Sequence, residues 1–293
     1  MKIAFFGLPL AALLLDADGH ELVYVGICRK NALGTRRLKK RVRCPVDVVP
    51  KLDDAATRAK IVATEPDLIV SWFWTKKIPK ALLALPRLGA FGVHPSLLPR
   101  HRGPDPYFWA IDAGDAVTGV TAHRLEEQYD TGAMLGKKTL AIDPSWNAWT
   151  LAKKLDRPSL ALLRETAKAF ASTSPPNEEP QNEEEATEAP APADEDLELS
   201  FAWPAERILR RVRAASPWPG AYFDVGGKLL TIVRAEIARD VPKALAPGEA
   251  ALVGDRVIVR AGEGALVIHE ARDEDERSLD AHALAAFFLA GEI

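Results

Sequence analysis

One histidine and one aspartate carry the clearest chemical signal in this sequence. His94 follows a short apolar run, residues 89–93, and opens a loop between Pro95 and Pro99. Asp130 comes further along the chain, at the start of the turn-forming sequence Asp-Thr-Gly. A carboxylate beside a histidine favours the imidazolium and orients the ring, so that the ring can stabilise a developing oxyanion and move protons. The two residues predict a general acid–base pair if the fold brings them together; two unrelated structural positions are the alternative.

The segments around these two residues predict a parallel sheet that would position them. Buried strands are expected at residues 2–6, 21–27, 67–72, 89–93 and 119–125. Short helices are expected after the first strand and at residues 53–63, 79–85 and 104–113. Strands alternating with helices are typical of a parallel α/β sheet, whose strand ends carry loops suited to catalysis. No Gly-x-Gly-x-x-Gly follows the first strand, which argues against a dinucleotide site.

The composition indicates a chain with two cores. At 293 residues and 47% apolar, the chain is long enough for two domains. Cys28 and Cys44 are its two cysteines, which indicates free thiols in a reducing compartment rather than a disulfide scaffold or a cysteine-rich metal site. No apolar run reaches the ~18 residues of a membrane span, and no long apolar segment follows the N-terminus. We therefore expect a cytoplasmic protein that binds no metal and no membrane.

A basic run follows the second predicted strand. Residues 28–44 contain eight Lys and Arg residues and no acid. The run is either a solvated basic loop or a loop that contacts phosphates, since clustered cations neutralise phosphates and release counterions. A nucleic acid is therefore a candidate partner.

The composition changes abruptly after residue 171. Residues 172–199 combine prolines and acids with no Lys or Arg, so the segment repels itself and has little to bury. We expect an extended interdomain linker there. Beyond it, a basic amphipathic helix at 204–214 and five short strand segments separated by glycine turns predict a small β-barrel.

The amino-acid sequence of the loop and of the segments after it resembles that of a known family. Residues 94–103 read His-Pro-Ser-Leu-Leu-Pro-Arg-His-Arg-Gly, and Gly-Val-Thr at 119–121 and Asp-Thr-Gly at 130–132 follow in order. This order resembles the N10-formyltetrahydrofolate-dependent formyltransferases, and the chain as a whole is most similar to their methionyl-tRNA branch. In that family an Asn, a His and an Asp form the catalytic trio. His94 and Asp130 match two of them, and Gly92 stands where the family has its Asn.

The resemblance implies a fold and a domain plan. It implies an α/β chain with a Rossmann-like parallel-sheet formyltransferase domain at residues 1–171 and an acidic, Pro-rich linker at 172–199. A C-terminal OB-like β-barrel that binds tRNA would follow at 200–293, and the protein is expected to be a monomer.

The resemblance also implies binding residues. The formyl donor, N10-formyltetrahydrofolate, is expected to contact Trp74, Ser96, Leu97, Leu98, Pro99, Gln128 and Tyr129. Initiator methionyl-tRNA is expected to contact the basic run through Arg36, Arg37, Lys39, Lys40, Arg41 and Arg43. Trp72 and Trp74 have core packing as an alternative role, because large aromatic residues fill cores as well as pockets. His101 is expected to be a surface histidine and His123 a structural one.

The activity implied is formylation of methionyl-tRNA for translation initiation. Two alternatives stay open at this point. One is a formyltransferase for an amino sugar or another small amine, against which the basic run and the barrel argue. The other is a catalytically impaired paralogue that binds tRNA or folate, which Gly92 favours because glycine has no amide to donate. A bound water or a backbone N–H could also fill that gap.

Overall fold

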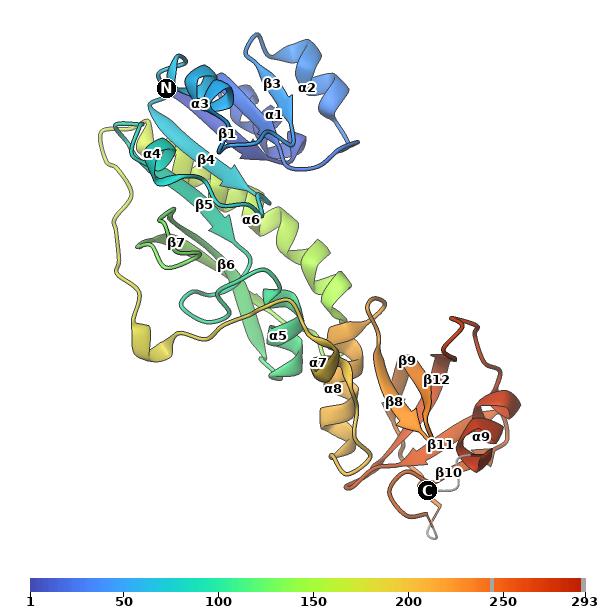
Figure 1. The fold of residues 1–293 in the computed structure, drawn as a ribbon. Coiled ribbons are helices and arrows are strands. Elements are labelled where there is room, and N and C mark those ends of the chain that lie inside the picture. The colour runs from blue at the N-terminus through green and yellow to red at the C-terminus, as the bar shows by residue number, and fades with distance from the viewer. Residues whose placement is uncertain (243–244, 291–293) are drawn as a thin grey trace. The chain divides into compact units, whose positions relative to one another are not determined.

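The computed structural model describes residues 1–242 and 245–290, and it divides into two compact units (Figure 1). Unit 1 takes residues 1–106, 117–141 and 154–190, and unit 2 takes residues 107–116, 142–153 and those from 191 onward. These boundaries differ from the expected ones at 171 and 199. The acidic segment up to Pro190 groups with unit 1, and two short stretches before residue 171 group with unit 2. The last residues of the expected C-terminal domain, 291–293, lie outside the described residues.

Unit 1 is built on a seven-stranded sheet in the order β3-β2-β1-β4-β5-β6-β7. Its strands are β1 (Lys2–Gly7), β2 (Glu21–Ile27), β3 (Val46–Val48), β4 (Leu68–Trp72), β5 (Ala90–His94), β6 (Val117–Arg124) and β7 (Met134–Ala141). The first five run parallel, and β6 and β7 add antiparallel pairings. The strand order reverses between β1 and β4, and α/β sheets bind ligands in the crevice at the carboxyl ends of such strands. The predicted parallel sheet is confirmed.

The helices that follow these strands are short, apart from the last. They are α1 (Pro9–Ala17), α2 (Thr35–Arg41), α3 (Ala55–Val62), α4 (Lys80–Leu83), α5 (Pro106–Asp112) and α6 (Ala148–Phe170). α6 continues through Pro158, where the sequence predicted an interruption. Within unit 1 this helix packs on the sheet: the ring of Phe170 stacks on Phe91 at 5.6 Å, and the hydroxyl of Ser159 accepts the Trp72 indole N–H at 2.7 Å. α6 therefore covers the strands that lead to the loops of interest.

The basic run contains a helix where a loop was expected. α2 takes residues 35–41, with Leu38 fully buried as its anchor. The six cations expected to bind tRNA are all exposed or partly exposed, and Arg41 forms an ion pair with Asp16 of α1. The apolar side of a short helix thus fixes one turn of the run and leaves its charges in solvent.

Unit 2 contains a five-stranded antiparallel sheet in the order β10-β11-β12-β9-β8. Its strands are β8 (Ala221–Val225), β9 (Lys228–Ile237), β10 (Ala250–Val253), β11 (Arg256–Arg260) and β12 (Ala265–Arg272), and its helices are α7 (Asp194–Leu197), α8 (Ala205–Ala215) and α9 (Ala281–Ala290). The separate C-terminal β-domain is confirmed, and its sheet is antiparallel, as the expected OB-like β-barrel requires. The pairings found in the described part of the chain leave β10 and β8 at the two edges of the sheet.

The arginines of α8 are largely committed to unit 2 itself. Arg211 is buried and its guanidinium binds the carboxylate of Asp112 at 2.9 Å. Arg210 donates to the backbone carbonyl of Asp112, and Arg213 donates to that of Pro144. Arg207 is exposed and lies 3.8 Å from the centre of the Trp203 ring. Three of the four arginines of this helix therefore form contacts within unit 2.

Candidate active site

The fold brings His94 and Asp130 together. His94 is the last residue of β5, and Asp130 lies in the turn after β6 with φ +57°. The His94 Nδ1 atom lies 3.4 Å from Oδ2 of Asp130. Both side chains are largely shielded from solvent, with 6% and 16% of their area exposed. The predicted acid–base pair is thus present in space.

Backbone groups of the loop after β5 hold both side chains. The other ring nitrogen of His94, Nε2, donates to the carbonyl of His101 at 2.8 Å. Asp130 Oδ2 accepts the backbone N–H of Gly103 at 3.0 Å. His101 itself is buried, so its expected position on the surface is wrong. The hydrogen bond between the His101 carbonyl and the His94 ring connects this part of the loop to the end of β5.

A second histidine meets the same carboxylate. The Nε2 atom of His123 lies 3.4 Å from Oδ1 of Asp130, and its Nδ1 donates to the carbonyl of Arg124 at 2.8 Å. Burial lowers the pKa of His123 to about 4, and the charge of His94 adds to this while Asp130 opposes it. The sequence analysis took His123 for a structural histidine and missed its contact with Asp130. The register of β6 against β5 was the missing information, because it sets His123 directly opposite Gly92.

The hydrogen bonds of the two rings fix where protons can lie. A backbone carbonyl only accepts, so His94 Nε2 and His123 Nδ1 must each carry a hydrogen. If both rings were neutral, both would turn lone pairs toward Asp130. The three groups therefore fit best with an added proton between them. Burial lowers the pKa of His123, so this ring is the least favourable of the three groups for that proton.

Gly92 has close neighbours at the point where a side chain would begin. It lies two residues before His94 in β5, so the two positions face the same side. A Cβ atom built there would stand 3.1 Å from Cδ2 of Leu125 and 3.5 Å from the carbonyl of Ser71. Its φ is not in the left-handed region. A side chain at this position requires a small movement of Leu125 and no backbone strain.

The acidic segment, residues 178–189, is bonded to this site instead of forming a free linker. It follows α6 as the long yellow stretch in Figure 1. Its backbone pairs with Met134 of β7 at one end, and at the other Thr187 and Ala189 bond to the loop after β5. The segment is ordered here although its composition gives it little to bury, because it supplies backbone groups and a carboxylate that the neighbouring loops bind.

The side chains expected to bind folate fall into two groups. Ser96 and Leu98 are buried, and the Ser96 hydroxyl donates to the Arg100 carbonyl at 2.6 Å, so both hold the loop together. Pro99 is also buried and Leu97 partly so. Gln128 and Tyr129 are exposed. These residues shape or border the site, and their role toward folate stays a prediction.

Trp74 lies in the loop after β4 and is half-buried. Its ring packs edge-on against Phe6 at 5.3 Å. Its indole N–H is buried and has no hydrogen-bond acceptor among the described residues. The neighbouring Lys77 stands 5.5 Å above the Tyr129 ring, so the loop after β4 and the turn before Asp130 meet. Trp74 therefore packs against the core, as one of its two expected roles requires, and its contact with folate stays a prediction.

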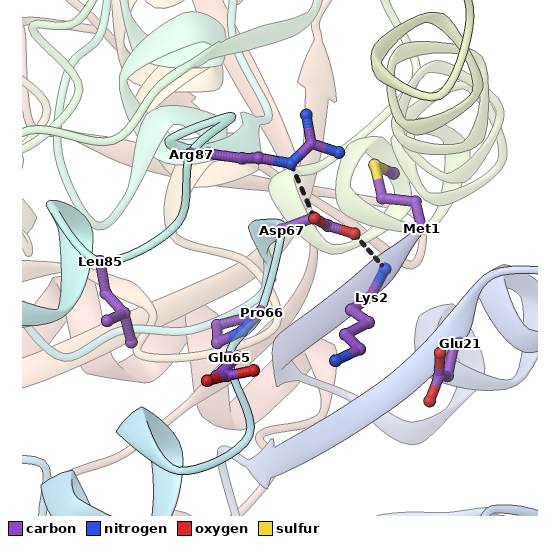
Figure 2. A pocket seen from close by; sticks show the side chains of 8 residues that line it. All are labelled: Met1, Lys2, Glu21, Glu65, Pro66, Asp67, Leu85 and Arg87. Atoms are coloured by element: carbon purple, nitrogen blue, oxygen red, sulfur yellow. Dashed lines mark hydrogen bonds and ion pairs between the residues drawn. The ribbon is translucent and has the colours of Figure 1, made fainter.

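A separate hollow lies at the amino-terminal ends of the strands. Figure 2 shows it near the start of β1, with Asp67 accepting the backbone N–H of Lys2 at 2.8 Å and the guanidinium of Arg87 at 2.9 Å. His94 lies at the opposite, carboxyl-terminal ends of the strands, so this hollow is not the candidate site. In the part of the chain that the structure describes, no group of three His, Cys, Asp or Glu residues could hold a metal ion. None of the described helices is both long and apolar enough to cross a membrane.

The comparisons with known proteins agree with this geometry. The sequence profile described as formyl transferase matches residues 10–166, and that of the formyl transferase C-terminal domain matches residues 193–288. The chain belongs to the formyl transferase family. This formyl transferase is 34% identical to a methionyl-tRNA formyltransferase from Thiobacillus denitrificans, over 99% of this chain and 96% of the relative. It is 39% identical to one from Myxococcus xanthus, over 83% and 77% of the two chains.

Solved structures share the fold at lower identity. HypX from Aquifex aeolicus, solved with tetrahydrofolic acid, aligns with a TM-score of 0.65 at 23% identity over 99% of this formyl transferase. The match spans 48% of the HypX chain, about half of its length. An N-formyltransferase from Helicobacter canadensis, solved with folinic acid and dTDP-3-aminofucose, aligns with a TM-score of 0.69 at 13% identity, over 92% and 99% of the two chains. At these identities the likeness concerns the fold.

Proposed function

We propose that this formyl transferase moves a formyl group from N10-formyltetrahydrofolate to the amino group of methionyl-tRNA. The observation that carries the proposal is the buried His94–Asp130 pair at the carboxyl end of β5. The relatives named methionyl-tRNA formyltransferases support the acceptor, since one of them aligns over nearly the whole chain. The proposal places the protein in the cytoplasm as a monomer.

Formyl transfer takes two steps, which are attack by the amine and breakdown of the tetrahedral intermediate. The methionine amine attacks the formyl carbon, and the carbonyl oxygen becomes an oxyanion in a tetrahedral intermediate. The bond from this carbon to N10 of the folate then breaks, the amine loses a proton, and N10 gains one. A protonated His94 stabilises the oxyanion, and Asp130 holds that ring charged and accepts the amine proton. At 3.4 Å the contact between the two groups is open enough to rearrange around a substrate, as catalytic hydrogen bonds often tighten only in the complex.

Gly92 makes this site one donor short of the family's trio. Loss of one oxyanion donor costs about 10²–10³ in rate. The groups nearest to Gly92 are the side chain of Leu125 and the carbonyl of Ser71, and neither of them donates a hydrogen bond. A water near Gly92 would donate less effectively than a fixed amide, because it must be oriented at the moment of reaction. We therefore expect a slow but active enzyme.

The formyl donor would lie at the carboxyl ends of β1 and β4. Trp74 is half-buried in the loop after β4, and the exposed part of its ring would form an aromatic wall for a flat heterocycle. Tyr129, exposed beside Asp130, would border the folate. N10-formyltetrahydrofolate supplies the formyl group itself. The protein's residues bind it, orient it and move the protons.

The acceptor tRNA would be gripped by α2 and the residues after it. Arg36, Arg37, Lys39, Lys40 and Arg43 reach solvent, and no ion pair is found for them among the described residues. Arg41 shares its charge with Asp16 and would contribute less. Such a cluster favours a polyanion over a small neutral amine.

The test is formylation itself. Purified protein, N10-formyltetrahydrofolate and initiator methionyl-tRNA should give formyl-methionine after mild hydrolysis of the tRNA ester, detected by mass spectrometry. His94→Ala is the control that should abolish the product while leaving the fold intact. Parent protein that yields no more product than His94→Ala would overturn the proposal.

A further inference from the structure

One glutamine of the acidic segment links the two halves of the catalytic pair. Gln181 lies just before the short 3-10 helix η1 (Glu183–Glu185). Its side-chain NH₂ donates to the backbone carbonyl of Asp130 at 2.7 Å and to that of Gly132 at 2.8 Å. Its carbonyl oxygen accepts from Nε and Nη2 of Arg102 at 3.1 and 2.8 Å. Every hydrogen-bonding group of this amide is in use.

Arg102 carries the link on to His94. Its side chain is only 6% exposed, and the Glu183 carboxylate binds it through two hydrogen bonds of 2.8 and 2.7 Å. Its backbone directly follows His101, whose carbonyl accepts the His94 Nε2–H. Gly103, on the other side, donates its N–H to the Asp130 carboxylate. Gln181 therefore bonds to the turn that carries Asp130 and to the residue between the two backbone groups that hold His94 and Asp130.

The turn at Asp130 needs such support. Asp130 has φ +57°, a conformation that costs energy in a residue with a side chain. Gly132 is buried, and a Cβ there would stand 2.2 Å from the carbonyl of Arg124. The carbonyls of Asp130 and Gly132 point to the same NH₂ group, so this group fixes the direction of the turn.

We propose that Gln181 is a positioning residue of the formyl-transfer site, holding the Asp130 turn against the His94 loop. This proposal rests on the proposed function for its kinetic test. The role demands two donors and an acceptor in one planar group, which only an amide side chain provides. Glutamate in its place keeps the shape and the contact with Arg102 but has no hydrogen to give. Its charge would also face two backbone carbonyls.

The first test is a kinetic comparison of Gln181→Glu with the parent. Misplacing catalytic groups by about 1 Å costs up to roughly 10²-fold in rate, so kcat should fall by about ten- to hundredfold. The KM for N10-formyltetrahydrofolate should change less than kcat, since only Gln128 and Tyr129 of the proposed folate-binding residues belong to the Asp130 turn. Glu184→Gln is the control, because Glu184 is an exposed acid of the same segment. It should keep the parent kcat. A Gln181→Glu enzyme with the parent kcat would overturn the proposal.

The second test needs no acceptor and separates this proposal from the proposed function. The nitrogen chemical shifts of the His94 ring, measured by NMR in the free protein, respond to a carboxylate beside Nδ1. They should change in Gln181→Glu and stay constant in Glu184→Gln. Unchanged His94 shifts in folded Gln181→Glu would contradict the role of Gln181 even if the parent formylates no tRNA. If Gln181→Glu fails to fold, Gln181→Asn serves instead, because it keeps the donors and the acceptor on a shorter side chain. It should show smaller changes in kcat and in the His94 shifts. Values equal to those of the parent would contradict the proposal.

Discussion

His123 lies directly opposite Gly92 in the antiparallel pairing of β5 with β6. Gly92 and the His123 ring are therefore neighbours on one face of the sheet, and His123 Nε2 lies 3.4 Å from Oδ1 of Asp130. Gly92, the position that the resemblance assigns to an Asn, therefore has beside it a histidine whose pKa is lowered by burial.

Gly92→Asn should raise kcat by up to about two orders of magnitude, because a fixed amide would donate to the oxyanion. The φ of Gly92 is outside the left-handed region, and Leu125 needs to move by only a few tenths of an ångström. Steady-state kinetics should show little change in folate KM, as expected for an interaction made in the transition state. Gly92→Ala is the matched control, which adds the Cβ without the amide and should gain nothing. A folded Gly92→Asn enzyme no faster than Gly92→Ala would show that the missing amide does not limit the reaction.

His94 and Asp130 should behave as one unit. His94→Ala, Asp130→Ala and the double variant should lose similar activity, because removing either residue disables the proton transfer that both perform. Single-turnover rates with methionyl-tRNA measure this. Additive losses, or an Asp130→Ala enzyme close to the parent, would remove the acid from the mechanism.

His123 should make the protein sensitive to mild acid. Its pKa is lowered from 6.5 to about 4 by burial, so between these values the unfolded chain binds a proton that the folded protein does not. The contribution of this group to stability is therefore full above pH 6.5 and falls as the pH drops toward 4. Urea unfolding at several pH values should show the slope. His123→Gln, which cannot titrate, should reduce it; equal slopes in parent and variant would be inconsistent with a neutral buried His123.

Lys39 and Lys40 of α2 should contribute to tRNA affinity through phosphates. Replacing both with alanine should weaken binding and lower the slope of log affinity against log salt by about 0.7–0.9 for each phosphate that is no longer neutralised. Binding titrations at several salt concentrations give this slope. The control replaces Lys51 and Lys168, which are exposed cations outside the basic run. If the control pair changes the slope as much as the α2 pair does, α2 is not a specific tRNA-binding element.

The sequence predicted the sheet from local patterns, and it predicted the contact of His94 with Asp130 from a series of motifs that resembles the formyltransferases. Apolar runs placed β2 at its observed bounds and β5 within one residue. The loop after β5 and the Asp-Thr-Gly turn indicated His94 and Asp130 through their residue types.

The rest of the site depended on pairing between distant segments. The contact of His123 with Asp130 follows from the register of β6. Gln181 and Glu183 lie in a segment whose composition indicates disorder, yet buried Arg102 binds both. A charged segment can be ordered when a neighbouring loop supplies a buried cation, and no local pattern in the sequence shows that partner.

Acceptor choice is the most direct test of the proposed activity. The ratio kcat/KM should be measured for initiator methionyl-tRNA, methionine amide and a dTDP-linked amino sugar, each with N10-formyltetrahydrofolate. We expect methionyl-tRNA to be the best substrate by a wide margin, and His94→Ala to lose at least about 10² of that rate. Faster formyl transfer to the amino sugar would contradict the proposed activity. So would tRNA binding without formylation in both the parent and Gly92→Asn.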